Sequence, residues 1–112
     1  MKAVVYARTA RKQPKDANSI QAQIDACQLC AKARKYQISF VFSDAGFSGA
    51  NLNRPALSKM REYIAHHPID MVIVQDLSRL TRFMADWLVI ESELAGHNVR
   101  LCIVPLSQGD EI

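Results

Sequence analysis

The 112-residue chain lacks the features that would place it in a membrane or on the secretory pathway. No apolar run approaches the ~20 residues that a membrane-spanning helix needs. The N-terminal segment Met1–Tyr6 is too short, and too soon followed by Arg8, to act as a secretory signal. Single domains usually have ~100–150 residues, so the length leaves room for one core. We therefore expect one cytoplasmic domain with no membrane association.

Cysteine is scarce, and its pattern favours neither a disulfide framework nor a metal site. Three cysteines make an odd number in a chain without an export signal. Cys27 and Cys30 form a C-x-x-C pair, but no second ligand pair follows at the spacing of a zinc site. Both fall within a predicted helix, whereas a thioredoxin-like motif would lie just after a strand. We expect both to be small core residues, and we expect no metal.

Two glycine-rich nucleotide-binding motifs are also absent. Neither G-x-G-x-x-G nor G-x-x-x-x-G-K-[ST] occurs, which disfavours a dinucleotide or P-loop site. A phosphoacceptor receiver domain would need an acidic cluster after its first strand, where Arg8 stands instead. The balance of 14 Lys and Arg against 11 Asp and Glu, a net charge of +3, permits a nucleic-acid partner without requiring one.

What the chain does have is a regular alternation of apolar runs and helical periodicities. Four short apolar runs predict strands, at residues 3–6, 38–42, 71–74 and 99–104. Strands that are apolar throughout and alternate with helices are typical of a parallel sheet covered on both faces. The predicted fold class is therefore α/β, a three-layer sandwich around a mainly parallel sheet.

Three helical segments are predicted between these strands. The first starts after Asn18, which can cap it with Gln21 as the capping-box partner. The second starts at Pro55, a residue suited to the first helical position. The third runs from about residue 78 or 82 to residue 94, with Gly96 as its C-terminal cap. The apolar faces are expected to consist of Ile20, Ile24, Cys27 and Ala31, then Leu57, Met60 and Ile64, then Phe83, Trp87, Ile90 and Leu94.

Arginines follow three of the predicted strands at their carboxyl ends, where open α/β sheets bind ligands. They are Arg8 after the first strand, Arg54 in the second loop, and Arg79 and Arg82 after the third. The last two are three residues apart at a predicted helix start, which would put them on one side. Four guanidiniums in one crevice would repel each other unless an anion lay among them, and arginine suits phosphate oxygens. The pattern predicts a phosphate site; the alternative is surface pairing with Asp44, Asp76 or Asp86.

Five segments in order give the chain a resemblance to the catalytic domain of the serine recombinases, the resolvase/invertase family. They are Tyr6-Ala7-Arg8-Thr9-x-Arg11, Ser19-Ile20-x-x-Gln23, Asp44-Ala45-Gly46-Phe47-Ser48-Gly49, Arg54-Pro55-Ala56-Leu57 and Ser78-Arg79-Leu80-Thr81-Arg82. The D-x-G-x-S-G loop followed by R-P-A-L is similar to the large, integrase-like branch. The resemblance implies a resolvase-like sheet, a catalytic domain over residues 1–105, and residues 106–112 as a truncated linker toward an absent long helix and C-terminal DNA-binding region.

The resemblance also implies a chemistry and its residues. Members cut and rejoin double-stranded DNA at specific sites through a 5′-phosphoserine intermediate, without metal or cofactor. The position of the serine nucleophile is occupied here by Ala10. The other implied catalytic residues are Arg8, Gln23, Asp44, Arg54, Arg79 and Arg82, and the expected DNA contacts are Arg11, Lys12 and Ser48.

The same resemblance implies partners and an origin. The full-length protein is expected to be a homodimer that assembles into a synaptic tetramer on DNA, and the isolated domain a monomer or weak dimer. We expect a cytoplasmic, nucleoid-associated protein of bacterial, phage or transposon origin. The target site, and the choice between integration, resolution and inversion, stay open.

Ala10 is the main departure from the family pattern. Alanine has no hydroxyl and cannot form a phosphoserine bond. Thr9, in an extended backbone, points to the opposite side, and Ser48 belongs to a motif in which it is not the nucleophile. We interpret the chain as an inactive Ser-to-Ala form, engineered in the first instance or naturally dead in the second. The alternatives are a non-enzymatic DNA- or phosphate-binding regulatory relative and an unrelated phosphohydrolase.

A second departure is Ser78, where many relatives have aspartate. Serine can cap a helix by accepting a backbone N–H, but it cannot act as a general acid or base at neutral pH. Asp76 lies two residues earlier and is not assigned that role.

Overall fold

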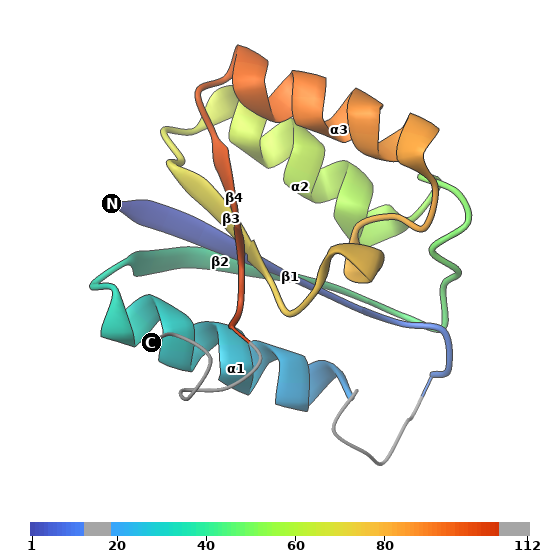
Figure 1. The fold of residues 1–112 in the computed structure, drawn as a ribbon, viewed down its shortest axis with the longest axis horizontal. Helices are drawn as coiled ribbons and strands as arrows, with labels where there is room; N and C mark the ends of the chain where they lie inside the picture. Colours follow the sequence, from blue (N-terminus) through green and yellow to red (C-terminus); the bar gives the residue numbers. More distant parts are fainter. Residues whose placement is uncertain (13–18, 106–112) are drawn as a thin grey trace.

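The computed structural model describes residues 1–12 and 19–105, which form a parallel four-stranded sheet with helices on both faces (Figure 1). The strands are β1 (Lys2–Thr9), β2 (Gln37–Ala45), β3 (Met71–Val74) and β4 (Arg100–Ile103), in the order β2-β1-β3-β4. The helices are α1 (Ile20–Ala33), α2 (Pro55–His66) and α3 (Met84–Gly96), with a short 3₁₀ helix, η1 (Leu77–Arg79). All paired strands are parallel, which confirms the predicted α/β sandwich.

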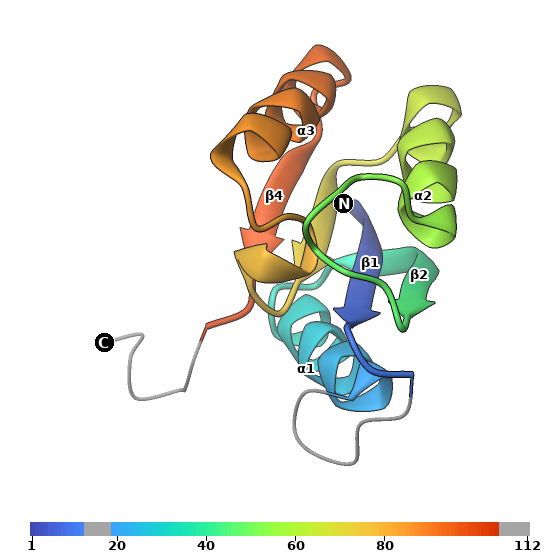
Figure 2. The same ribbon diagram turned by 90° about the vertical axis from the view of Figure 1, so that its right-hand side faces the viewer.

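Helix α1 covers one face of the sheet, while α2 and α3 lie side by side over the other (Figure 2). Strand β1 lies inside the sheet, and its side chains alternate between the two faces. Val4 and Tyr6 belong to the core beneath α2 and α3. Ala3 and Val5 belong to the core beneath α1, which also holds the three cysteines as free thiols. The predicted burial of Cys27 and Cys30 is confirmed. None of the described helices is long and apolar enough to span a membrane.

Two strands extend beyond their predicted ends, and the extension brings polar site residues into the sheet. β1 continues past Tyr6 to Thr9, and β2 continues past Phe42 to Ala45. Arg8 consequently lies next to Asp44 in the parallel register. A search for apolar runs misses these ends because buried polar side chains occupy them. The predicted bounds of β3 are confirmed, and β4 is shorter than predicted by one residue at each end.

The start of α1 differs from the prediction. The N-cap is Ser19, whose hydroxyl accepts a hydrogen bond from the backbone N–H of Ala22 at 3.1 Å. The predicted cap Asn18 lies outside the described residues. Gln21 does not act as a capping-box partner, since its amide donates to Asp25 at 2.8 Å. The buried face of α1 includes Gln23, which the apolar periodicity did not select.

The segment predicted as the third helix divides into two elements. Its first turn is η1, and α3 begins only at Met84. Gly96 is the last residue of α3 rather than its cap, and Asn98 takes the left-handed conformation that ends the helix, with φ 58°. Asparagine is the usual substitute for glycine there. Ile90 and Leu94 are buried as predicted, whereas Phe83 is 55% exposed.

Pro55 begins α2, as predicted, and its predicted apolar face is confirmed. Leu57, Met60 and Ile64 are all buried against the sheet. Arg54 is the residue just before Pro55 and has an extended backbone. The start of α2 therefore fixes the backbone position of Arg54 at the carboxyl edge of the sheet.

Candidate active site

The carboxyl ends of β1 and β2 and the segment after β3 bring the predicted site residues together, at the right of Figure 1. Arg8 comes from β1, Arg54 precedes α2, and Arg79 is the last residue of η1. These residues are separated by 25 to 71 positions in the chain, yet their side chains and carbonyls are directly hydrogen-bonded. The predicted convergence of Arg8, Arg54 and Arg79 is observed.

Arg8 is buried, at 2% exposure, and its guanidinium connects two loops. Its Nη1 donates to the carbonyl of Phe47 at 2.8 Å, in the loop after β2. Its Nη2 donates to the carbonyl of Ser78 at 2.9 Å, and its Nε donates to the carbonyl of Arg79 at 3.1 Å, both in η1. The side chain thus connects the loop after β2 to η1 through backbone carbonyls in both.

Arg54 is buried equally deeply, at 1% exposure, and makes a parallel set of contacts. Its Nη1 donates to the carbonyl of Arg79 at 2.8 Å and to the hydroxyl of Tyr6 at 3.1 Å. Its Nη2 donates to the carbonyl of Leu80, and its Nε to the carbonyl of Asn51 at 3.1 Å. Arg8 and Arg54 therefore share one acceptor, the carbonyl oxygen of Arg79.

The proximity of several cations has an electrostatic consequence for Arg8. Burial lowers the pKa of Arg8, and the charge of Arg54 lowers it further. Arg79 and Arg82 act in the same direction. Because like charges held together out of water destabilise one another, an anion placed among these side chains would relieve the repulsion.

Asp44 caps α2 from a distance in the sequence. Its Oδ1 accepts from the backbone N–H of Ala56 at 2.8 Å, and its Oδ2 accepts from that of Leu57 at 3.0 Å. A carboxylate is favourable at a helix N-terminus, where the backbone N–H groups have no partner within the helix. Oδ2 also accepts from the hydroxyl of Tyr6 at 2.7 Å. Asp44 is 3% exposed, so its carboxylate positions α2 rather than facing solvent.

Tyr6, which the sequence analysis did not select, connects Asp44 to Arg54. Burial raises the pKa of Tyr6, and its hydrogen bond to Asp44 raises it further. The hydroxyl consequently stays protonated, donating to the carboxylate and accepting from the guanidinium. The predicted alternative, pairing of the four site arginines with Asp44, Asp76 or Asp86, is met once among the described residues, between Arg79 and Asp76 at 3.4 Å.

Gln23 fixes the backbone of Arg8. Its side-chain oxygen accepts from the Arg8 N–H at 3.0 Å, and its amide donates to the Arg8 carbonyl at 3.0 Å. Gln23 has no exposed surface. A helix residue thereby completes the hydrogen bonding of a strand, which fits the predicted supporting role.

Arg79 and Arg82 do not share one helix face, because the chain leaves the 3₁₀ helix between them. Arg79 is part-buried, and its Nη1 donates to the carbonyl of Arg8 at 3.3 Å. Arg82 is exposed, and its backbone N–H donates to the carbonyl of Gly49 at 3.1 Å. Gly49, a second residue that was missed, allows this approach: a Cβ there would lie 2.9 Å from Nη2 of Arg8 and 3.1 Å from Cγ of Arg82.

Ala10 directly follows β1 and is exposed, as are the predicted DNA contacts Arg11 and Lys12. The neighbouring Thr9 is 3% exposed, and its hydroxyl donates to the carbonyl of Arg11 at 2.5 Å. Thr9 is therefore engaged away from the solvent-facing position that Ala10 occupies.

The two serines of the site have local partners. Ser48 is exposed, and its hydroxyl accepts from the backbone N–H of Ala50 at 3.0 Å. Ser78 donates its hydroxyl to the carboxylate of Asp76. The predicted capping by Ser78 is not observed, because Ser78 lies inside η1 rather than ahead of a helix.

Comparison with protein families gives one match to a family model. Residues 3–111 match the model described as the resolvase N-terminal domain. A DNA recombinase homologue of Bacillus subtilis (strain 168) is 37% identical over 101 residues, which are 89% of this chain. The chain spans 20% of the length of that relative.

Solved structures agree with this match. The N-terminal catalytic domain of TP901-1 integrase superposes with a TM-score of 0.86 and 30% identity, covering 93% of this chain and 78% of that one. A resolvase family site-specific recombinase from Streptococcus pneumoniae superposes with a TM-score of 0.80 and 28% identity, covering 100% of this chain and 74% of that one.

Proposed function

We propose a function from the premise that this chain belongs to the resolvase N-terminal domain family. The solved structures similar to it include the catalytic domain of an integrase and a site-specific recombinase. The proposed function is that of the catalytic domain of a site-specific DNA recombinase, with Ala10 at the position of the nucleophile. The observation that carries the proposal is the arginine cluster, defined here as the buried Arg8 and Arg54 with the part-buried Arg79, at the strand end that leads into position 10.

The arginine cluster suits a phosphodiester for a reason of charge. Burial lowers the pKa of Arg8, and the charges of Arg54, Arg79 and Arg82 lower it further, so an anionic group among them would offset their repulsion. The exposed cations Arg11, Lys12 and Arg82 lie around the same edge and would meet DNA first. For Arg8 to contact DNA directly, a phosphate oxygen would have to replace the carbonyl oxygen of Phe47 or Ser78 as its acceptor. A charged phosphate oxygen forms a stronger hydrogen bond with a guanidinium than a neutral carbonyl does, which favours this exchange.

With serine at position 10, the hydroxyl oxygen would attack phosphorus and displace the 3′-oxygen of the cut strand. Negative charge that develops on the phosphoryl oxygens in the transition state would be stabilised by the preorganised guanidiniums. Gln23 would act as a positioning residue for the backbone of Arg8. Asp44 and Tyr6 would position the start of α2 and the guanidinium of Arg54. With Ala10 no covalent bond to DNA forms, and the chain binds without cutting.

The test restores the missing oxygen. In the full-length parental protein, Ala10→Ser should give a covalent protein–DNA adduct on a mapped recombination site, detected as an SDS-resistant band. Ala10→Gly is the matched control, because it changes the same exposed position without adding a hydroxyl. A second serine variant that also carries Ser48→Ala should retain the adduct. Intact site binding by Ala10→Ser without an adduct would refute the catalytic assignment.

Ala10 itself favours a second candidate, a non-enzymatic DNA- or phosphate-binding relative of the recombinases. This candidate predicts duplex binding that weakens steeply with salt, because bound phosphates release counterions. It also predicts no adduct after Ala10→Ser. The same experiment therefore separates the two functions.

The proposed partners are double-stranded DNA and further copies of the full-length protein in a synaptic tetramer. The proposed catalytic domain covers residues 1–105. We expect this 112-residue chain alone to be a monomer or weak dimer, measured by sedimentation at micromolar concentration. A tight tetramer under those conditions would contradict that expectation.

A further inference from the structure

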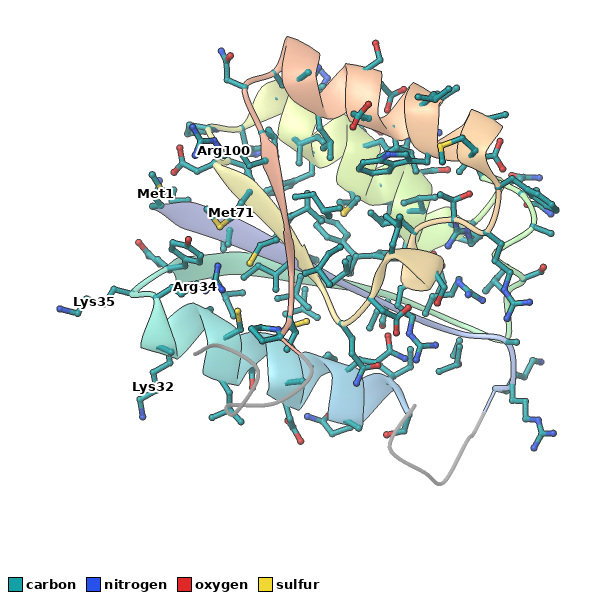
Figure 3. The ribbon with its side chains drawn as sticks, viewed as in Figure 1. Met1, Lys32, Arg34, Lys35, Met71 and Arg100 are labelled. Atoms are coloured by element: carbon teal, nitrogen blue, oxygen red, sulfur yellow. The ribbon has the colours of Figure 1, made fainter. Side chains whose placement is uncertain are left out.

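A hollow of about 310 Å³ lies beside the edge strand β4, away from the arginine cluster. Figure 3 labels four of the residues that line it, at the end of the sheet where the strands begin: Met1, Arg34, Met71 and Arg100. The hollow is lined in part by Arg34, Tyr36, Arg100 and Cys102. Arg34 and Arg100 form no ion pair with any other residue in the described ranges.

Two thiols meet at this hollow. The Sγ of Cys102, on β4, lies 3.9 Å from the Sγ of Cys30, on α1, and each residue is 8% exposed. Nη1 of Arg34 lies 3.7 Å from the Sγ of Cys102 and donates to it. Cys27, the third cysteine, has no exposed surface, and its thiol donates to the carbonyl of Ile73 at 3.8 Å.

We propose that Cys30 and Cys102 are an oxidisable pair that reacts with a peroxide entering through the hollow and forms an intramolecular disulfide between α1 and β4. The Cys102 thiol releases its proton, the thiolate attacks one peroxide oxygen, and the O–O bond breaks; the leaving hydroxide takes up a proton, so the products are a Cys102 sulfenic acid and water. The Cys30 thiol then releases its proton, its thiolate attacks the Cys102 sulfur, the S–O bond breaks, and the leaving hydroxide takes up a proton and departs as a second water. Two thiols are oxidised to one disulfide, and one hydrogen peroxide is reduced to two waters.

The geometry favours this pair over the other two combinations. A disulfide has an S–S length of about 2.05 Å, so the two sulfurs, 3.9 Å apart, must approach by about 2 Å through rotation of the side chains together with a shift of α1 against β4. Cys102 is the member that lines the hollow and contacts a cation. Cys27 faces the sheet interior and is closed to solvent, so it is the internal reference thiol.

The surroundings of Cys102 set the pH dependence. Burial raises the pKa of Cys102, and the adjoining Cys30 raises it further, while the charge of Arg34 acts in the opposite direction. The other titratable groups of the residues that line the hollow are Tyr36, Arg100 and the α-amino group of Met1. Because the thiolate is the reacting form, the rate of oxidation should rise about tenfold per pH unit below the thiol pKa.

The test treats the 112-residue chain with hydrogen peroxide and maps the products by mass spectrometry. The expected product has lost two hydrogen atoms and contains the Cys30 and Cys102 peptides joined, with Cys27 still alkylatable. Cys27→Ser should form the same product at the same rate, whereas Cys30→Ser should stop at oxidised Cys102 without a cross-link.

The two arginines on the hollow, Arg34 and Arg100, provide a matched pair of variants. Arg34→Gln should slow disulfide formation about tenfold at neutral pH by removing the charge beside the thiolate. Arg100→Gln, on the same hollow without a contact to the sulfur, should change the rate much less. A cross-link that includes Cys27, oxidation of Cys102 without a cross-link in the unchanged chain, or equal rates for the two arginine variants would overturn the proposal.

Discussion

Asp44→Asn should be strongly destabilising although it changes a single atom. The carboxylate accepts three hydrogen bonds while only 3% exposed, two from the first turn of α2 and one from Tyr6. An asparagine side chain has one oxygen, so its amide nitrogen must face either the N–H of Ala56 or that of Leu57. Two donors facing each other in a buried site leave both unsatisfied.

The magnitude follows from these contacts. A buried group left without its partner costs about 1–3 kcal/mol, and loss of a charged cap at a helix N-terminus costs roughly 1 kcal/mol more. We therefore expect Asp44→Asn to lower the free energy of unfolding by about 3 kcal/mol. That is a large fraction of the ~5–15 kcal/mol that typically stabilises a domain.

Urea unfolding followed by far-UV circular dichroism measures this change. Asp25→Asn is the matched control, because Asp25 is exposed and accepts from Gln21 on the same helix; its effect should stay below about 0.5 kcal/mol. If both variants unfold at the same urea concentration, the capping of α2 by Asp44 does not contribute as argued.

Three further predictions concern other contacts. Gly49→Ala should lower the free energy of unfolding by about 1–3 kcal/mol, because its Cβ would lie 2.9 Å from the buried guanidinium of Arg8. Gly96→Ala is the control: a Cβ there meets open space, so it should raise the free energy of unfolding by about 0.5–1 kcal/mol. A higher urea midpoint for Gly49→Ala than for Gly96→Ala would contradict this reasoning. Gln23→Ala should cost about 1–3 kcal/mol by leaving the buried N–H of Arg8 without its partner, while the Arg8 carbonyl keeps the weaker bond from Arg79. A change under about 0.5 kcal/mol would reject this role. The side-chain hydrogen bond to Arg61 lowers the pKa of Glu93, so this pair should stabilise above the unfolded pKa of Glu93 and lose that contribution, under about 1 kcal/mol for an exposed pair, as pH falls through the lower folded value. Glu93→Gln should remove that part of the difference between urea midpoints at neutral and acidic pH, and an unchanged difference would refute it.

The architecture could be predicted from the sequence because each strand contains a short apolar run. Met71–Val74 is bounded by polar residues, and its predicted limits are those observed. The ends of β1 and β2 were missed because Arg8 and Asp44 are polar, and the contacts that bury them come from distant loops. Ser19 and Asn98 replace the predicted caps, since neighbouring polar residues offer a helix end several alternatives that tertiary packing decides.

The candidate site was predictable in its members but not in their contacts. The order of Arg8, Arg54 and Arg79 along strand ends was enough to expect them together. That two of their guanidiniums are almost fully buried on backbone carbonyls could not be read from spacing, because carbonyl orientation depends on the folded loops. The glycine-rich loop after β2 held the signal for Gly49, and no local signal marked Tyr6.

The carbonyl of Arg79 couples the movements of two arginine side chains. Its oxygen accepts hydrogen bonds from both Arg8 and Arg54. If one of these side chains moves away, the hydrogen bonding of the other therefore changes. If an anion draws one guanidinium outward, the carbonyl keeps the other as its donor, and the repulsion between the two cations falls. We therefore expect one of the two side chains to move toward an anionic ligand while the other stays on the Arg79 carbonyl, in a stepwise manner.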